Sequence, residues 1–325
     1  MRLAVLSSRS IDQAVYWRNF APPLENALAS LPNATLVVAP PFRRPTLRAN
    51  MPAWLSAIRT VRKADAVFWI QLHLRPPGPV WALAHARAGT RRAAYATDIF
   101  PNVFADLPRY ARMQRLSFCF VDYRIPALAL AQANSGIRFE WLPSGFSAQV
   151  FRDQGLERDV YAFWMGRRHA PLHEALVAHC KDRGLDYEYL EPPGRPIPLD
   201  ELSRLSSRAR YFLALPPDIE DPVRTGGTSP LTSRYLEGVG AGCRLLGMRP
   251  RSGEFELLLP DDAIVECAPD GSDLSVVLDE ADSDPGFEAK SADTCAFAHR
   301  EHTWERRAED VYGRLLTAEQ GDTQP

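Results

Sequence analysis

Glycine, hydroxyl-bearing, cationic and acidic residues are gathered between Thr225 and Gly247, in the sequence TGGTSPLTSRYLEGVGAGCRLLG. Its Gly-Gly turn can adopt positive φ and lets a ligand approach the backbone. Thr228, Ser229 or Thr232 is expected to cap a helix whose first N–H groups point outward, which favours a phosphate. Glu237, two turns into this helix, is placed to accept hydrogen bonds from a ribose. The stretch predicts an anion and sugar site; the alternative is an ordinary helix that ends at a glycine.

A second segment with phosphate-binding chemistry is GRRH at Gly166–His169, directly after an expected strand. Gly166 would permit close backbone approach, and the guanidinium groups of Arg167 and Arg168 are rigid, bidentate donors to phosphate. The alternative is a solvated basic turn. In a doubly wound domain, this loop and the start of the helix that carries Arg234 can both lie at the carboxyl edge of the sheet, so the two segments can face one ligand.

Two loops in the first half also contain residues that could do chemistry. Asp98 in ATDIFPN directly follows an apolar strand, so its side chain could serve as a base or orient an acceptor hydroxyl. The alternative interpretation is that Asp98 is only a turn residue before Ile99–Phe100–Pro101. His73 in QLHLRP lies between leucines, a setting more typical of a packing residue. Asp98 and His73 are therefore candidates on the acceptor side.

The length and composition of the chain limit the classes of protein to which it can belong. The chain has 325 residues, a length that exceeds what one hydrophobic core usually supports, so two domains are predicted. Of these residues, 46% are hydrophobic and 24% are charged. A formal net charge of −2 gives no reason to expect nucleic acid as a partner. The five cysteines are scattered without CxxC spacing, which argues against a disulfide framework and a zinc site.

The chain contains no window of about 18 apolar residues, and its N-terminus reads as a strand instead of a signal peptide. No transmembrane segment is therefore expected, and a cytoplasmic location is expected, with peripheral association at the inner membrane left open. We recognise no basic amphipathic helix in the pattern, so a lipid-linked acceptor is unsupported. The motifs GxGxxG, GxxxxGK[ST], HExxH and GxSxG are missing, which argues against dehydrogenase, P-loop, zincin and α/β-hydrolase classes.

Short apolar runs alternate with longer amphipathic runs, the pattern of parallel sheets with crossover helices. It predicts an α/β fold with two doubly wound domains that meet near Trp141–Phe151. The acidic segments 218–221 and 279–284 are interpreted as solvated loops. The expected strands are 2–6, 35–39, 66–70, 93–97, 118–121, 138–141, 160–165, 186–190, 210–215, 243–246 and 263–266. The expected helices are 12–31, 52–63, 80–88, 105–115, 126–133, 170–181, 199–207, 229–241 and 299–316.

Four segments occur in a recognisable order: WLPSGF, FWMGRRH, TSRYLEGVGAGCRLLG and HREHTWERRAEDVYGRLL. In these segments the chain resembles the GT-B glycosyltransferases, most closely their family-4-like and CgeB-like bacterial branch. The resemblance spans nearly the whole chain and implies two Rossmann-like domains facing a cleft. It places an acceptor domain at 1–145, a nucleotide-sugar domain at 146–300, and a helix that crosses back to the first domain, with a tail, at 301–325.

The resemblance also implies a role for each motif residue. Glu237 would bind the ribose hydroxyls of the donor, Arg167 with Arg168 would bind the diphosphate, and the backbone around Gly227–Ser229 would bind the sugar or the phosphates. These cations and a helix dipole would stabilise the departing nucleoside diphosphate, so neither a metal nor a cofactor is expected. The donor would be a nucleotide-diphosphate sugar, and the acceptor a hydroxyl on a glycan, a glycolipid or a small molecule.

The chain departs from the family pattern at two positions. Ser229 stands where many relatives have a glutamate, and the lysine usual shortly after the GRRH arginines is missing, so Arg234 or Arg168 would replace that cation. A retaining transfer needs no protein base because the leaving phosphate can take the acceptor proton, whereas an inverting one would use Asp98. The alternatives are a nucleotide-sugar 2-epimerase of the same fold and a catalytically idle partner of another transferase.

Overall fold

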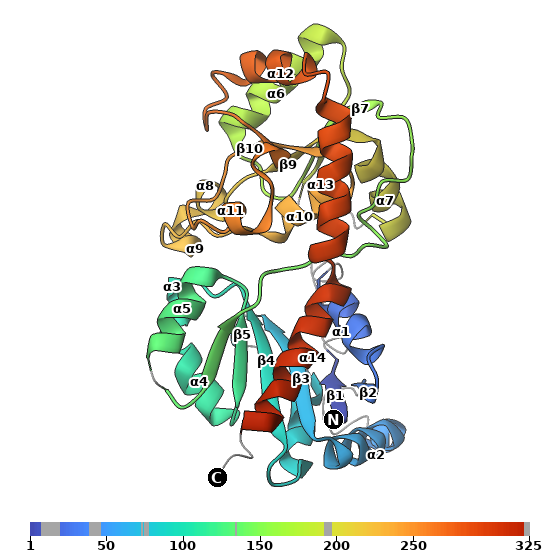
Figure 1. Ribbon diagram of the computed structural model, residues 1–325, viewed down its shortest axis with the longest axis vertical. Helices are drawn as coiled ribbons and strands as arrows, with labels where there is room; N and C mark the ends of the chain where they lie inside the picture. Colours follow the sequence, from blue (N-terminus) through green and yellow to red (C-terminus); the bar gives the residue numbers. More distant parts are fainter. Residues whose placement is uncertain are drawn as a thin grey trace. The chain divides into compact units, whose positions relative to one another are not determined.

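By its internal contacts the chain divides into two compact units (Figure 1). Unit 1 comprises Met1–Ser144 and Trp304–Pro325, and unit 2 comprises Gly145–Thr303. Each unit contains one parallel sheet with helical connections, which confirms the predicted α/β fold. The computed structural model describes residues 1–7, 20–38, 47–72, 74, 78–133, 135–191 and 197–321. The candidate His73 lies outside these residues.

The sheet of unit 1 has six parallel strands: β1 (Leu3–Leu6), β2 (Ala34–Val37), β3 (Ala66–Leu72), β4 (Arg91–Thr97), β5 (Phe118–Val121) and β6 (Arg138–Trp141). Their order across the sheet is β2-β1-β3-β4-β5-β6, with Leu3 opposite both Ala34 and Ala66. The chain reverses direction across the sheet between β1 and β3. In such sheets, ligands bind outside the carboxyl ends of the strands at this switch point.

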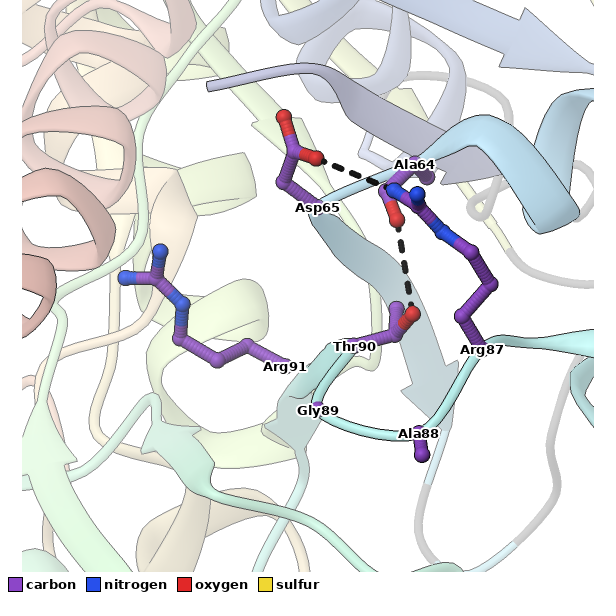
Figure 2. Close-up of a pocket in the computed structure, with 7 residues that line it drawn as sticks. All are labelled: Ala64, Asp65, Arg87, Ala88, Gly89, Thr90 and Arg91. Atoms are coloured by element: carbon purple, nitrogen blue, oxygen red, sulfur yellow. Dashed lines mark hydrogen bonds and ion pairs between the residues drawn. The ribbon is translucent and has the colours of Figure 1, made fainter.

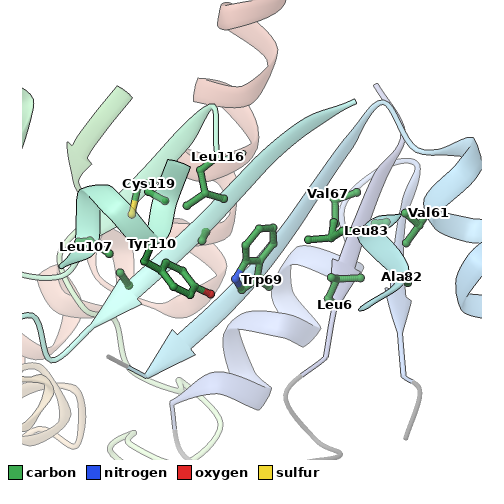
Figure 3. Packing of buried hydrophobic residues seen from close by; sticks show 14 of the residues in the cluster. Leu6, Val61, Val67, Trp69, Ala82, Leu83, Leu107, Tyr110, Leu116 and Cys119 are labelled. Atoms are coloured by element: carbon green, nitrogen blue, oxygen red, sulfur yellow. The ribbon is translucent and has the colours of Figure 1, made fainter. Parts of the chain in front are cut away.

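Each face of this sheet is covered by a separate hydrophobic cluster, because successive residues of a strand point to opposite faces. Trp69 of β3 belongs to one cluster, where Figure 3 shows it beside Tyr110. Phe68 belongs to the other, together with Tyr95 and Trp304. The central strands β1, β3 and β5 are buried on both faces, which explains why they read as continuous apolar runs instead of alternating ones.

The helices of unit 1 cover the two faces of the sheet in two groups. Residues of α1 (Ala21–Ala29) and α14 (Trp304–Gly321) belong to the Phe68 cluster. The Trp69 cluster is covered by α2 (Leu47–Lys63), η3 (Gly78–His85), α4 (Leu107–Met113) and α5 (Arg124–Gln132), and the short α3 (Pro101–Phe104) precedes α4. The predicted helix 80–88 is a 3-10 helix, and the predicted helix 105–115 is α4, which begins two residues later and ends two residues earlier than predicted.

The predicted helix 299–316 is in fact two helices that meet at the boundary between the units. Helix α13 (Phe287–Glu301) ends before His302, and α14 begins at Trp304. The carbonyl of His302 accepts a hydrogen bond from the N–H of Phe146 at 3.2 Å, which takes the place of a helical partner. The buried apolar side chains of α14 recur at spacings of four, three and four: Trp304, Ala308, Val311 and Leu315.

The sheet of unit 2 has five parallel strands: β7 (Val160–Met165), β8 (Tyr187–Leu190), β9 (Ala209–Ala214), β10 (Arg244–Gly247) and β11 (Ile264–Glu266). Their order is β11-β10-β9-β7-β8, so the switch point of this unit lies between β7 and β9. The remaining elements are α6 (Ala170–Arg183), α7 (Leu199–Arg208), α8 (Pro217–Glu220), α9 (Pro222–Thr225), α10 (Ser233–Gly240), α11 (Phe255–Leu258), η4 (Asp261–Ala263) and α12 (Leu274–Asp282).

The acidic segment 279–284 is largely exposed, as predicted, but it is not a loop, because α12 extends into it. Asp282, the last residue of α12, accepts hydrogen bonds from the hydroxyls of Tyr161 and Tyr211 at 2.8 Å each, and from Arg210 at 3.0 Å. This carboxylate joins α12 to the sheet. Among the residues that the structure describes, no helix is long and apolar enough to cross a membrane.

Candidate functional site

The switch point of unit 2 is flanked by the two chain segments that leave β7 and β9. Gly166–His169 follows β7, and residues 216–232 follow β9 and lead into α10. Figure 1 shows α8 and α9, which belong to the second segment, lying together at one end of this unit. The two segments that the sequence singled out, Gly166–His169 and 225–237, therefore meet at the carboxyl edge of one sheet.

Gly166 provides the closest approach between these two segments. Its φ is +120°, and a Cβ at this position would lie 2.4 Å from Nη2 of Arg234. The guanidinium group of Arg234 therefore packs directly against the glycine backbone, where no side chain would fit. The hydroxyl of Tyr189 donates to the carbonyl of Gly166 at 3.1 Å and fixes the turn from the neighbouring strand. Only glycine combines this backbone conformation with this space.

Replacing Gly166 with alanine is expected to lower the free energy of unfolding by roughly 2 kcal/mol, because the new Cβ adds a clash with Arg234 to an unfavourable φ. The matched control is Gly227→Ala, since Gly227 also has a positive φ of +76° but a Cβ there meets no heavy atom within 4 Å. That control should lose only about 1 kcal/mol. Urea denaturation measures both, and equal losses would show that the contact with Arg234 is unimportant.

The acidic segment 218–221, interpreted from the sequence as a solvated loop, instead holds arginines at this edge. The side chains of Asp218 and Glu220 are each 4% exposed. Asp218 accepts a hydrogen bond from Arg251 at 2.7 Å, and Glu220 accepts two from Nη1 of Arg234 at 3.0 and 3.1 Å. Burial disfavours the charged guanidinium, but Glu220 more than offsets this effect and raises the pKa of Arg234. Arg234 therefore stays charged, and Glu220 balances its charge within the protein.

The two arginines of the GRRH loop are more accessible. Arg167 pairs with Asp221, and the two side chains are 46% and 28% exposed. The pKa of Asp221 is lowered by the hydrogen bond from the N–H of Arg224 and by the charge of Arg167. Arg168 is exposed. An exposed ion pair is weak, so Arg167 can exchange its partner for another anion, and the loop presents two guanidinium groups at the switch point.

Glu237 is the buried acid of the site. It lies one helical turn after Arg234 on α10, and only 7% of its surface is exposed. Burial raises the pKa of Glu237 to about 7, although the charge of Arg234 and a hydrogen bond with Ser233 oppose the shift. A carboxylate in this position has two oxygens that can accept hydrogen bonds from the neighbouring hydroxyls of a sugar ring.

The raised pKa of Glu237 predicts that this residue makes unit 2 less stable as the pH rises. Between an unfolded pKa near 4.5 and a folded pKa of about 7, the native state binds more protons than the unfolded state, so stability falls with rising pH and then levels off. We expect wild type to lose on the order of 1 kcal/mol per pH unit relative to Glu237→Gln in this window. Urea denaturation from pH 5 to 8 measures this difference, and a constant difference would contradict the assignment.

Helix α10 begins at Ser233, with Thr232 as its N-cap residue, so the predicted start at Ser229 is wrong. Ser229 is buried in the irregular segment that precedes α10. Its Oγ accepts a hydrogen bond from the N–H of Arg251 at 3.1 Å, and its carbonyl accepts one from the N–H of Ser252 at 3.1 Å. Ser229 therefore joins this segment to the loop after β10.

The Gly-Gly turn has the predicted left-handed conformation. Gly226 and Gly227 have φ of +57° and +76°, and Gly226 ends α9. The hydroxyl of Thr228 donates to the carbonyl of Thr225 at 2.7 Å, which closes the turn. A Cβ at Gly227 would meet no heavy atom within 4 Å, so the backbone of this turn is open on one side.

Asp98 lies in unit 1, at the carboxyl end of β4, in a strained left-handed conformation with φ of +57°. Its N–H donates to Asp122 at 2.7 Å, and its carboxylate accepts a hydrogen bond from the hydroxyl of Tyr123 at 3.1 Å. Both partners directly follow β5 and are 5% exposed. The sequence analysis missed Asp122 and Tyr123, although a polar pair directly after the apolar strand FCFV is the same signal that singled out Asp98.

Two parallel α/β units of this kind define the GT-B fold, and comparison with solved structures confirms it. Sucrose-phosphate synthase from Thermosynechococcus elongatus matches 98% of this chain over 100% of its own, with 12% identity and a TM-score of 0.55. HepE from Anabaena, solved with UDP and glucose, matches the same shares with 11% identity and a TM-score of 0.55. AviGT4, a glycosyltransferase involved in avilamycin A biosynthesis, shares 14% identity over 98% of each chain, with a TM-score of 0.54.

These similarities establish the fold alone, because the sequence identities are low. No protein-family model matches the chain. No curated protein matches it either. The CgeB-like branch and the roles of the site residues stay predictions. Among the described residues, no three histidine, cysteine or acidic side chains are grouped so that they could hold a metal ion. The expectation of a metal-independent reaction also stays a prediction.

Proposed function

We propose that the protein is a glycosyltransferase that moves a sugar from a nucleotide-diphosphate sugar to an acceptor hydroxyl. The observation that carries this proposal is the position of Glu237, a buried acid beside Arg234 at the switch point of a GT-B unit. A protein of this fold, HepE, has been solved with UDP and glucose. A buried carboxylate with a raised pKa destabilises the fold, so its presence favours a binding role.

Unit 2 would bind the donor. The carboxylate of Glu237 would accept hydrogen bonds from the ribose, and the exposed guanidinium groups of Arg167 and Arg168 would bind the diphosphate. Arg234 is already paired with Glu220, so it would position Gly166 and Glu237 instead of supplying the free cation that replaces the family's lysine. The open backbone at Gly227 and the N–H groups at the start of α10 would complete the anion site.

In the proposed transfer, the bond between the anomeric carbon and the diphosphate oxygen breaks, and a bond from the acceptor oxygen to that carbon forms. The electron pair leaves with the diphosphate, where Arg167 and Arg168 would stabilise the negative charge. In a retaining reaction the acceptor proton goes to the departing phosphate. In an inverting reaction it would go to the carboxylate of Asp98, which Tyr123 and Asp122 hold in place.

A catalytically idle nucleotide-sugar-binding partner is the second candidate. It is favoured by the pairing of three arginines near the switch point, Arg167, Arg234 and Arg251, with carboxylates of the segment 218–221. This pairing lowers the positive charge available to stabilise a departing diphosphate. An idle partner would still bind the nucleotide but would not release it from a nucleotide sugar.

Release of nucleoside diphosphate separates the two candidates. The protein would be incubated with UDP-glucose, GDP-mannose, dTDP-glucose and ADP-glucose, with water as a slow acceptor, and the product measured by chromatography. We expect release from one donor by wild type and by Glu280→Ala, an exposed position on α12, and loss of release in Glu237→Ala. Binding without release in wild type would support the idle partner and contradict the transferase.

A further inference from the structure

The two units carry opposite charge. Unit 1 contains 21 arginine and lysine residues against 12 aspartate and glutamate residues, a formal excess of nine positive charges. Unit 2 contains 17 against 28, an excess of eleven negative charges. The net charge of −2 for the whole chain conceals this difference. Asymmetry of this size between two halves of a chain points to a polyanionic partner for the basic half.

Part of the positive charge of unit 1 lies on α2. The sequence from Asn26 to Ala64 contains no acidic residue, and α2 itself contains Arg48, Arg59, Arg62 and Lys63. The predicted helix, 52–63, lacks the first turn that the structure adds, because Pro52 resembles a helix start. That turn adds Met51 to the helix, whereas Arg59, Arg62 and Lys63 already lie within the predicted range.

The two sides of α2 have different chemistry. Its inner side packs Trp54, Ala57 and Val61 into the Trp69 cluster, where they are 5%, 2% and 0% exposed. Its outer side presents two apolar side chains, Met51 and Leu55, which are 43% and 46% exposed.

Basic residues continue this outer side toward the end of the helix. Arg59, Arg62 and Lys63 are exposed, and none of them forms an ion pair with any other described residue. Met51, Leu55, Arg59 and Arg62 follow at spacings of four, four and three, so they share one side of the helix. The outer face of α2, defined as these four residues with Lys63, is therefore apolar in its first half and basic in its second.

The basic surface continues past the end of α2. A pocket of about 350 Å³ follows it, lined in part by Asp65, Arg87 and Arg91 (Figure 2). Asp65 pairs with both Arg2 and Arg87, at 3.2 and 3.3 Å, so one carboxylate serves two guanidinium groups that are each 54% exposed. A positive charge therefore remains in excess beside Lys63.

We propose that the outer face of α2 binds the surface of a lipid bilayer that contains anionic lipids. The basic residues would lie at the headgroups, and Met51 and Leu55 would enter the boundary with the acyl chains. A nucleic acid would neutralise the same charges but would offer nothing to two exposed aliphatic side chains, so the combination favours a membrane. This proposal does not depend on sugar transfer.

Sedimentation with lipid vesicles tests the proposal. Wild type is expected to bind vesicles of phosphatidylcholine mixed with phosphatidylglycerol, to bind vesicles of phosphatidylcholine alone much less, and to dissociate as salt is raised. Arg59→Gln/Arg62→Gln should weaken binding about 25-fold, or about fivefold for each charge removed. Met51→Gln/Leu55→Gln should also weaken it, because the apolar contact with the acyl chains is lost.

The matched control is Lys181→Gln/Arg204→Gln, which removes two exposed basic residues from unit 2 and should leave binding unchanged. Circular dichroism melting would confirm that all variants fold. Failure of wild type to bind the mixed vesicles at low salt, or equal binding by wild type and the arginine variant, would overturn the proposal. Displacement by a single-stranded oligonucleotide, together with full binding by the Met51/Leu55 variant, would indicate a nucleic-acid surface instead.

Discussion

Replacing Glu220 with glutamine is expected to lower the free energy of unfolding by about 4 kcal/mol. Both carboxylate oxygens of Glu220 accept hydrogen bonds from Arg234, and their side chains are 4% and 23% exposed. Glutamine preserves the shape of the side chain but leaves the charge of Arg234 without its main counter-ion. Removing one partner of a buried pair has a larger effect than removing both, because the remaining charge stays desolvated.

Urea denaturation of single and double variants measures this effect. Glu288→Gln is the matched control, since Glu288 pairs with Arg210 at 2.7 Å but is 65% exposed, and a change within about 0.5 kcal/mol is expected there. Adding Arg234→Met to Glu220→Gln should recover part of the lost stability. A loss below about 1 kcal/mol in Glu220→Gln would show that the pair is not the strong internal contact that the geometry indicates.

Replacing Glu237 with glutamine is expected to weaken binding of a ribonucleoside diphosphate about 100-fold, because charged acceptors form the stronger hydrogen bonds with hydroxyls. The same change should leave the melting temperature at pH 8 unchanged or higher. Burial raises the pKa of Glu237 to about 7, so wild type must keep a buried charge at pH 8 that the amide does not carry. Loss of binding with gain of stability is the signature of a residue retained for its ligand.

Calorimetric titration with UDP, GDP or ADP, whichever binds wild type, measures the change in affinity. A 2′,3′-dideoxy form of that nucleotide provides a second control, because it lacks the hydroxyls that Glu237 would bind. Wild type and Glu237→Gln should bind the dideoxy form with similar, low affinity. If the variant loses affinity equally for both nucleotides, Glu237 does not contact the ribose.

The sheets could be predicted from the sequence because their strands are short apolar runs with clear ends. Phe118–Val121 and Val160–Met165 have the predicted bounds in the structure. The start of α10 could not be placed in the same way. The N–H of Leu231 donates to the buried carboxylate of Glu254 at 2.6 Å, which ties the segment before α10 to the loop after β10. The two residues are 23 positions apart in the sequence, so their contact cannot be seen in the local pattern.

The residues of the candidate site could be placed from the sequence where local sequence determines position, and they were missed where distant residues determine it. Gly166 and Glu237 follow from the rule that ligands bind at the carboxyl edge of a doubly wound sheet. The role of residues 218–221 depends on arginines at positions 167, 234 and 251, so an acidic run was misread as a solvated loop. Charge runs need their tertiary partners before they can be interpreted.

The central claim, that the carboxyl edge of unit 2 binds a nucleoside diphosphate, is tested most directly by thermal shift without metal. Wild type, Arg167→Ala and Glu237→Ala would each be melted with UDP, GDP, dTDP and ADP. We expect one nucleotide to raise the melting temperature of wild type clearly and that of both variants little, which would also identify the base. No shift with any of the four at millimolar concentration would contradict the claim.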